Sequence, residues 1–123
     1  MKVKLFIACL ILLNFSAKAQ KKTIEDRIID TVFKIKEVKQ MSNLIKKESK
    51  GKHHLLLFTN GEPSKETPYY WIKVWEDNGV TTVTIFDFFV YPKTFKIEYY
   101  DTVNDTAISL EEWRRQNKKQ ISN

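Results

Sequence analysis

Apolar residues recur at helical spacing in the first part of the chain that follows residue 20. One stripe, with three or four residues between successive members, consists of Ile24, Ile28, Val32, Ile35, Val38, Met41 and Ile45. Thr23 precedes this stripe as a candidate N-cap, and Gly51 follows it as a candidate terminator. One helix over 24–48 would be about 37 Å long, whereas the strands that follow would span about 27–34 Å. We therefore expect a break or kink near Lys36 to Gln40, so the segment is either one kinked helix or a helix pair.

The pattern changes to short runs of strand-forming residues after Gly51. Strands are predicted over residues 53–60, 69–76, 80–91 and 95–101. Asn78-Gly79 predicts a type I′ hairpin turn, and Ser109 opens a capping box for a short C-terminal helix that carries Trp113. The expected fold class is α+β, with an N-terminal helix or helix pair packed on a four-stranded antiparallel meander sheet.

Large aromatic residues dominate the predicted sheet. A two-residue turn at Asn78-Gly79 would place Trp75 opposite Thr82 and Trp71 opposite Phe86. One face would then be smoothly apolar and receive the first helix; its members are Ile72, Val74, Val83, Ile85 and Phe89. The opposite face carries the candidate binding residues Trp71, Trp75, Phe86 and Phe88.

Three explanations remain for that second aromatic face. The loop over residues 61–68 and the helix of Trp113 could cover it. It could be buried in a homodimer or against an envelope protein partner, as exposed apolar patches often are. It could also line a small-ligand pocket in a curved sheet. A bulge in the long third strand would reverse the two faces beyond it.

The first nineteen residues resemble an export signal. Met1 to Lys4 is positively charged, an apolar run extends over residues 5–15, and Ala17-Lys18-Ala19 predicts cleavage before Gln20. Cys9 lies inside the apolar run and would be removed with it. We expect a periplasmic or secreted product, one domain over residues 20–123, with no disulfide and no stable membrane span after cleavage.

The charge of the chain is unevenly distributed. Removal of residues 1–19 takes away three of 21 basic residues and none of 15 acidic ones, which leaves a net charge of +3. Residues 34–52 carry a local charge of +5, and residues 53–108 carry −4. This small net charge on an exported chain argues against nucleic-acid binding. The basic segment is either a solvated helix face or a surface that faces an anionic envelope component.

Familiar catalytic arrangements are missing from residues 20–123. His53 and His54 are adjacent on a strand and point to opposite faces, so they cannot share one metal ion. Acidic side chains that could form a glycosidase pair are ordinary sheet-surface charges in our interpretation; they are Asp87, Glu98 and Asp101. We expect no enzyme activity, no cofactor and no metal site.

Residues 86–101 resemble a hairpin of PepSY-like and other cystatin-like α+β domains from small exported bacterial proteins. Val90, Thr94 and Ile97 match that pattern, while Phe95 replaces a glycine. Because that glycine position often has a positive φ, Phe would be strained there by about 1 kcal/mol or more. The resemblance implies the fold rather than a function, and we expect the hairpin to close differently.

Asp-Thr-aliphatic triplets resemble the O-glycosylation acceptor pattern of some Gram-negative exported proteins. They begin at Asp30, Asp101 and Asp105. Thr102 and Thr106 are the glycosylation candidates, since a turn presents its acceptors better than the helix that holds Thr31. Turn propensity alone also explains Asp and Thr at these positions.

Together these features predict a non-enzymatic binding or inhibitor-type module that acts through the aromatic face. A small-ligand carrier with a pocket in the curved sheet is the alternative, and an envelope hydrolase is the third.

Overall fold

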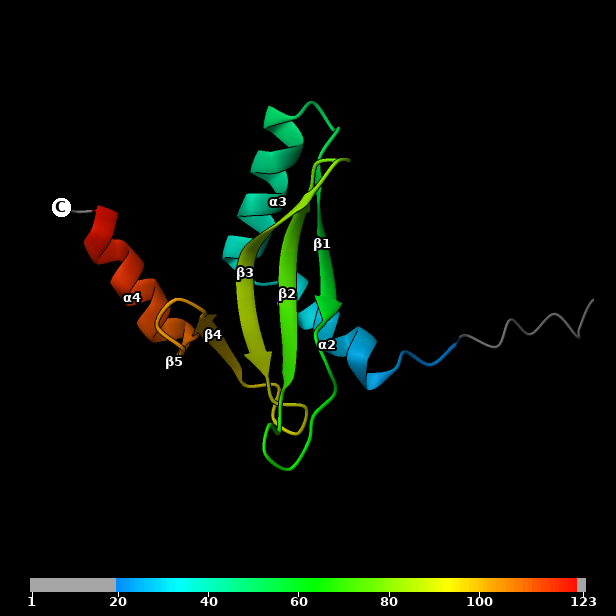
Figure 1. Ribbon diagram of the computed structural model, residues 1–123, viewed down its shortest axis with the longest axis vertical. Coiled ribbons are helices and arrows are strands. Elements are labelled where there is room, and N and C mark those ends of the chain that lie inside the picture. Colours follow the sequence, from blue (N-terminus) through cyan, green and yellow to red (C-terminus); the bar gives the residue numbers. More distant parts are fainter. Residues whose placement is uncertain (1–19, 122–123) are drawn as a thin grey trace, which may run out of the picture.

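The computed structural model describes residues 20–121 as three helices on one face of a five-stranded antiparallel sheet (Figure 1). The elements in chain order are α2 (Ile24–Phe33), α3 (Lys36–Glu48), β1 (His54–Thr59), β2 (Tyr70–Asp77), β3 (Thr82–Val90), β4 (Ile97–Asp101), β5 (Thr106–Ser109) and α4 (Leu110–Ile121). The α+β class is confirmed. The predicted count of four strands is wrong, because the short segment after the Asp101–Asp105 turn pairs with β4 as a fifth strand. The predicted signal peptide over residues 1–19 lies outside the described residues.

The predicted N-terminal helix is a helix pair. Thr23 caps α2, since its hydroxyl accepts a hydrogen bond from the Asp26 backbone N–H at 3.1 Å. The break falls at Lys34 and Ile35, just before the predicted 36–40 interval. Ile35 has an extended ψ of 131° there, yet its side chain stays buried. The break therefore lets the apolar stripe follow the sheet instead of overshooting it.

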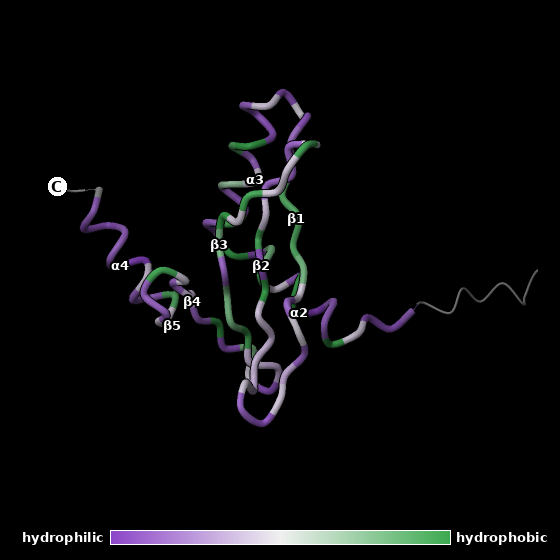
Figure 2. The backbone as a smooth tube through the Cα atoms, viewed as in Figure 1, coloured by the Kyte–Doolittle hydropathy of each residue, from purple (hydrophilic) through white to green (hydrophobic). Residues whose placement is uncertain are grey.

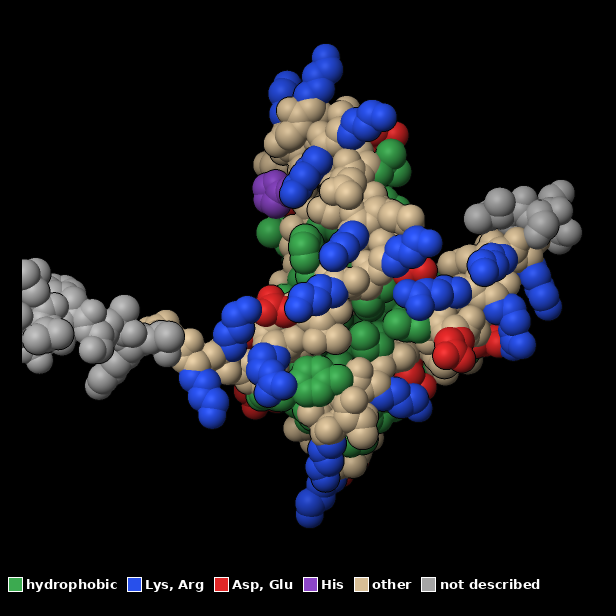
Figure 3. Space-filling model, turned by 180° about the vertical axis from the view of Figure 1, so that it is seen from behind, with side chains coloured by type: hydrophobic (Ala, Val, Ile, Leu, Met, Phe, Trp, Pro, Cys, Tyr) green, Lys and Arg blue, Asp and Glu red, His purple; other side chains and the backbone are tan. Residues whose placement is uncertain are grey.

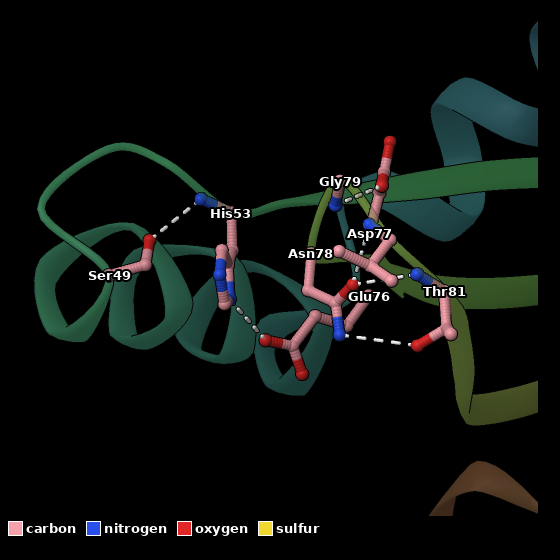
Figure 4. Close-up of polar contacts among 8 residues, drawn as sticks. Ser49, His53, Glu76, Asp77, Asn78, Gly79 and Thr81 are labelled. Atoms are coloured by element: carbon pink, nitrogen blue, oxygen red, sulfur yellow. Dashed lines mark hydrogen bonds and ion pairs between the residues drawn. The ribbon is translucent and has the colours of Figure 1, made fainter.

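The β2–β3 connection is a four-residue loop and not the predicted type I′ turn. Gly79 has a φ of 83°, whereas Asn78 has a negative φ, and a type I′ turn needs both to be positive. Asn78 Oδ1 instead accepts hydrogen bonds from the backbone N–H groups of Val80 and Thr81, at 3.0 and 2.8 Å (Figure 4). This side-chain capping replaces the tight turn, so Asp77 pairs with Thr82.

A β-bulge in β3 then changes the face of every later residue. Trp75 pairs with Thr84 and Val74 with Phe86, which leaves Ile85 without a partner in β2. Phe86 and Phe88 were predicted on the face opposite the helices, and that placement is wrong. Phe88 is fully buried in the core, and Phe86 packs against the same core.

The core lies between the sheet and the helices. Its buried members are Ile28, Val32, Ile35, Val38, Tyr70, Ile72, Val74, Phe88, Val90 and Trp113. Trp113 brings α4 to the same side as α2 and α3, because its ring stacks on Tyr99 at a centroid distance of 4.6 Å and meets Phe88 edge-on. Figure 2 shows hydrophobic segments along β1 to β3 and a mostly hydrophilic α4. The predicted core positions Ile72 and Val74 are confirmed.

The β3–β4 hairpin places Phe95 in the left-handed region. Its φ is 57°, and its backbone N–H donates to the Tyr91 carbonyl at 2.8 Å. Phe95 therefore adopts the positive φ that was expected at the position of the glycine it replaces. The Phe95 ring packs partly against the core, with the guanidinium of Arg27 5.1 Å from its centroid. These contacts offset a backbone strain of about 1–2 kcal/mol.

Candidate functional site

The sheet face opposite the helices is the candidate site, and we call it the open face. Side chains alternate along a strand, so Trp71, Lys73 and Trp75 of β2 point away from the buried Ile72 and Val74. No helix of the described chain packs on this face. The predicted binding residues Trp71 and Trp75 therefore lie on it as expected, half-buried, while Phe86 and Phe88 lie on the other side.

Three aromatic rings form a stack across the open face. Phe89 lies between Tyr69, at a centroid distance of 4.0 Å, and Tyr100, at 4.5 Å. Trp71 meets both Phe89 and Tyr100 edge-on, at 5.9 and 5.3 Å. Sequence analysis missed Tyr69, Phe89 and Tyr100 as site residues, since only the bulge brings Phe89 to this face.

A buried carboxylate fixes the orientation of Trp71. Asp87 is 5% exposed and accepts a hydrogen bond from Trp71 Nε1 at 2.7 Å. The ammonium of Lys73 lies 3.3 Å from the same carboxylate oxygen and 4.7 Å from the centroid of the Trp71 ring. A charge-assisted hydrogen bond and a cation–π contact thus hold one indole in place. This arrangement orients the Trp71 side chain before any ligand binds.

A pocket of about 370 Å³ opens above this cluster. The loop after β1 and the β4–β5 hairpin form its walls, and its lining residues are Asn60, Gly61, Glu62, Thr67, Tyr69, Trp71, Phe89, Tyr100, Asp105 and Ala107. Four are aromatic and two are acidic, and none of them is Lys, Arg or His. The Tyr100 hydroxyl donates to Asp105 at 2.7 Å, and this bond raises the pKa of the phenol. The composition suits a neutral or cationic ligand with an apolar ring.

A second hollow, of about 660 Å³, lies between two loops. Its lining combines three prolines with Tyr91 and two lysines: Pro63, Ser64, Lys65, Pro68, Tyr91, Pro92, Lys93 and Thr94. The Tyr91 hydroxyl donates to Glu98 at 2.8 Å, which raises the pKa of Tyr91 to about 12. Tyr91 therefore stays a neutral phenol at any physiological pH. Tyr91 is the one aromatic residue in its lining, against four in the first pocket, so this hollow is the weaker candidate.

Trp75 lies outside both hollows. Its ring meets Phe58 edge-on at 3.9 Å, and the neighbouring Leu56 is 40% exposed. The structure therefore separates the two predicted tryptophan anchors. Trp71 belongs to a pocket, and Trp75 belongs to a smaller apolar patch with Leu56 and Phe58.

The carboxylates considered for catalysis each have a structural partner. Asp87 contacts Trp71 and Lys73, as described above. Glu98 accepts the Tyr91 hydroxyl. Asp101 accepts the backbone N–H groups of Val103 and Asn104 in the β4–β5 turn, and hydrogen bonds from Asn104 hold its pKa below the usual range.

The two histidines face different acids at one end of the sheet. His53 Nδ1 lies 3.1 Å from Glu76, and His54 Nε2 lies 3.8 Å from Asp77 (Figure 4 shows the first contact). Within residues 20–121, no group of three or more His, Cys, Asp or Glu side chains could hold a metal ion.

The glycosylation candidates Thr102 and Thr106 are more accessible to solvent than Thr31, the threonine of the triplet in α2. Thr102 and Thr106 are exposed, in the β4–β5 turn and at the start of β5. Thr31 is half-buried, and its hydroxyl donates to the Arg27 carbonyl at 2.8 Å. The expected order of accessibility among the acceptors is confirmed. Their modification remains a prediction.

Comparison with protein families, with curated proteins and with solved structures finds no match to this chain. None of the helices over residues 20–121 has the length and apolarity needed to cross a membrane.

Proposed function

We propose that this protein is an exported, non-enzymatic binding module that holds a small ligand in the open-face pocket. The observation that carries the proposal is the pocket of about 370 Å³ with Tyr69, Trp71, Phe89 and Tyr100 in its lining. Binding pockets are typically concave and aromatic, with a few polar groups that fix the orientation of the ligand. The Asp87–Lys73 pair lowers the cost of binding, because it orders Trp71 in advance.

Binding of a protein partner or a second copy is the other candidate. It was the first expectation from sequence, and it depended on a continuous surface of four aromatic residues. Phe86 and Phe88 belong to the core, so that surface is reduced to Trp75 with Leu56 and Phe58. This patch favours a small contact rather than a complete interface of standard size.

The protein acts without a cofactor, in the periplasm or outside the cell, after loss of residues 1–19. An envelope hydrolase is disfavoured, because Asp87, Glu98 and Asp101 are each engaged in structural contacts. The helices on an antiparallel sheet are consistent with a cystatin-like or PepSY-like relationship.

The test uses the three tryptophans of the chain as reporters. Trp71 lies in the pocket, Trp75 lies on the open face outside the pocket, and Trp113 lies in the core. Their indole N–H groups give separate signals in a ¹⁵N-labelled sample screened with neutral and cationic aromatic compounds and with saccharides. A pocket ligand should shift the Trp71 signal and leave the Trp113 signal in place.

A matched pair of variants decides where such a ligand binds. Ala107→Trp fills the pocket from β5, whereas Val103→Trp adds the same side chain to the adjacent turn at a position that is 91% exposed. We expect Ala107→Trp to abolish binding and Val103→Trp to retain it. Equal binding by both variants, or ligands that move only the Trp75 signal, would refute the pocket and favour the partner patch.

A further inference from the structure

The charge of the protein divides between its two layers. The segments 20–52 and 109–121, which form the three helices, contain 14 Lys and Arg residues and seven Asp and Glu residues. The segment 53–108, which forms the sheet, contains four Lys and Arg residues and eight Asp and Glu residues. Figure 3 shows Lys and Arg side chains spread over much of the face seen from behind, with few acidic ones between them. The helix side is therefore a basic surface, and the open face lies on the opposite side.

The centre of this basic surface is a group of four lysines on α3, which we call the α3 lysine surface: Lys36, Lys39, Lys46 and Lys47. All four side chains are exposed; Lys36 and Lys47 lie on the side of the helix opposite the buried Val38 and Ile45, and Lys39 and Lys46 lie on its flank. None of them forms an ion pair with another residue between 20 and 121. The one acidic residue in the first turn of α3, Glu37, is engaged by Arg114 at 2.7 Å. The other acidic residue of α3, Glu48 at its C-terminal end, forms no ion pair with any of the four lysines, so α3 keeps a net positive charge.

Apolar side chains interrupt the same layer. Leu44 on α3 is 46% exposed, and Phe33 at the end of α2 is 41% exposed. Single exposed apolar residues also occur on solvated surfaces. Beside a lysine cluster, however, they match an interfacial helix, which buries such residues at the boundary between headgroups and acyl chains. Lysine also suits a fluid lipid surface, because its compact charge needs no fixed bidentate geometry.

We propose that the α3 lysine surface docks the protein on an anionic lipid bilayer. Lysines attract such a surface additively, by about fivefold in partitioning for each one, equivalent to ~1 kcal/mol. Leu44 and Phe33 add a short-range apolar contact that a soluble polyanion does not offer. In this orientation the helices face the lipid and the open face points to the solution, so the pocket stays accessible. This inference does not depend on the pocket holding a ligand.

The experiment measures cosedimentation of the exported protein with vesicles of neutral phosphatidylcholine, alone or with one third anionic phosphatidylglycerol. The test variant is Lys36→Glu/Lys47→Glu. The matched control is Lys65→Glu/Lys93→Glu, which changes the net charge equally in the loops at the far end of the sheet (Figure 1). Thermal unfolding confirms that both variants are folded.

We expect the protein to bind the anionic vesicles only, and less at high salt. Lys36→Glu/Lys47→Glu should weaken binding by about 25-fold or more, and the control by less than about threefold. Leu44→Ser should reduce vesicle binding while leaving binding to soluble heparin unchanged. If both charge variants lose vesicle binding to the same extent, net charge alone explains the binding and the proposal is overturned. A Leu44→Ser variant that binds vesicles normally would indicate a soluble polyanion as the partner and would overturn it as well.

Discussion

Removal of the Lys73 ammonium should strongly destabilise the fold, although Lys73 lies on the open face of the sheet. Asp87 is 5% exposed, and within residues 20–121 the ion pair and hydrogen bond to its carboxylate come from Lys73 at 3.3 Å and from the Trp71 N–H at 2.7 Å. Lys73→Met keeps the aliphatic stem but leaves the buried carboxylate with a single neutral donor. The cost of an uncompensated buried charge, and not the loss of a surface ion pair, then sets the effect.

The expected loss is about 2–3 kcal/mol of unfolding free energy, less than the ~3–5 kcal/mol for a completely buried pair, because the Lys73 side chain retains 21% exposure. Urea unfolding followed by circular dichroism measures it, as a lower midpoint at an unchanged slope. Lys96→Met is the control. Its Nζ lies 4.0 Å from Glu98 and its side chain is 62% exposed, so it should cost less than about 1 kcal/mol.

A double variant separates buried charge from lost packing. Asp87→Asn keeps an oxygen that can accept the Trp71 N–H but removes the negative charge. In the Lys73→Met background it should therefore restore stability instead of lowering it further. If Lys73→Met costs no more than Lys96→Met, or if the double variant is less stable than Lys73→Met alone, the buried-charge reasoning is wrong.

Two further changes test the helix contact and the strained hairpin. Hydrogen bonds from Arg114 hold the pKa of Glu37 below its ordinary value of 4.5, so the pair stabilises the fold above that pH and loses its contribution as the pH falls through the lower folded-state pKa. Glu37→Gln should thus cost about 1 kcal/mol near neutral pH and progressively less as the pH falls through the folded-state pKa of Glu37. Urea midpoints measured across pH test this, and a difference that does not change with pH would contradict it. Phe95 has a φ of 57°, so Phe95→Gly should be more stable to unfolding than Phe95→Ala by about 1 kcal/mol, the reverse of the usual order of Gly and Ala. Equal urea midpoints for the two variants would argue against backbone strain at this position.

The parts of the fold that local patterns specify could be predicted from sequence. The apolar stripe of α2 and α3, the Thr23 cap and the buried positions Ile72 and Val74 follow from periodicity and capping chemistry. Predicted strand ends differ from the observed ones by at most two residues. The break between the helices followed from a length argument, which requires a break without fixing its position. β5 was missed, because four residues with mixed polarity carry little strand signal.

The register of β2 and β3 could not be predicted, for two separate reasons. At the turn, Asn78-Gly79 fits both a two-residue hairpin and a side-chain-capped four-residue loop. The choice between them shifts the pairing of β2 and β3 by an even number of residues, so each side chain stays on the same face of the sheet. In β3, the bulge at Ile85 adds an odd shift that reverses them. The surrounding residues are all good strand formers, with no Gly or Pro to mark the position. The position of the bulge agrees with the packing of Phe86 and Phe88 in the core beneath the helices.

This bulge builds both the core and the candidate site. Without it, Phe88 would point to the open face and Phe89 to the helices, as the unbroken alternation predicts. The extra residue instead buries Phe88 against Trp113 and places Phe89 between Tyr69 and Tyr100. It also turns Asp87 toward Lys73, where the carboxylate can hold the Trp71 indole. The pocket is therefore a consequence of the same irregularity that completes the core.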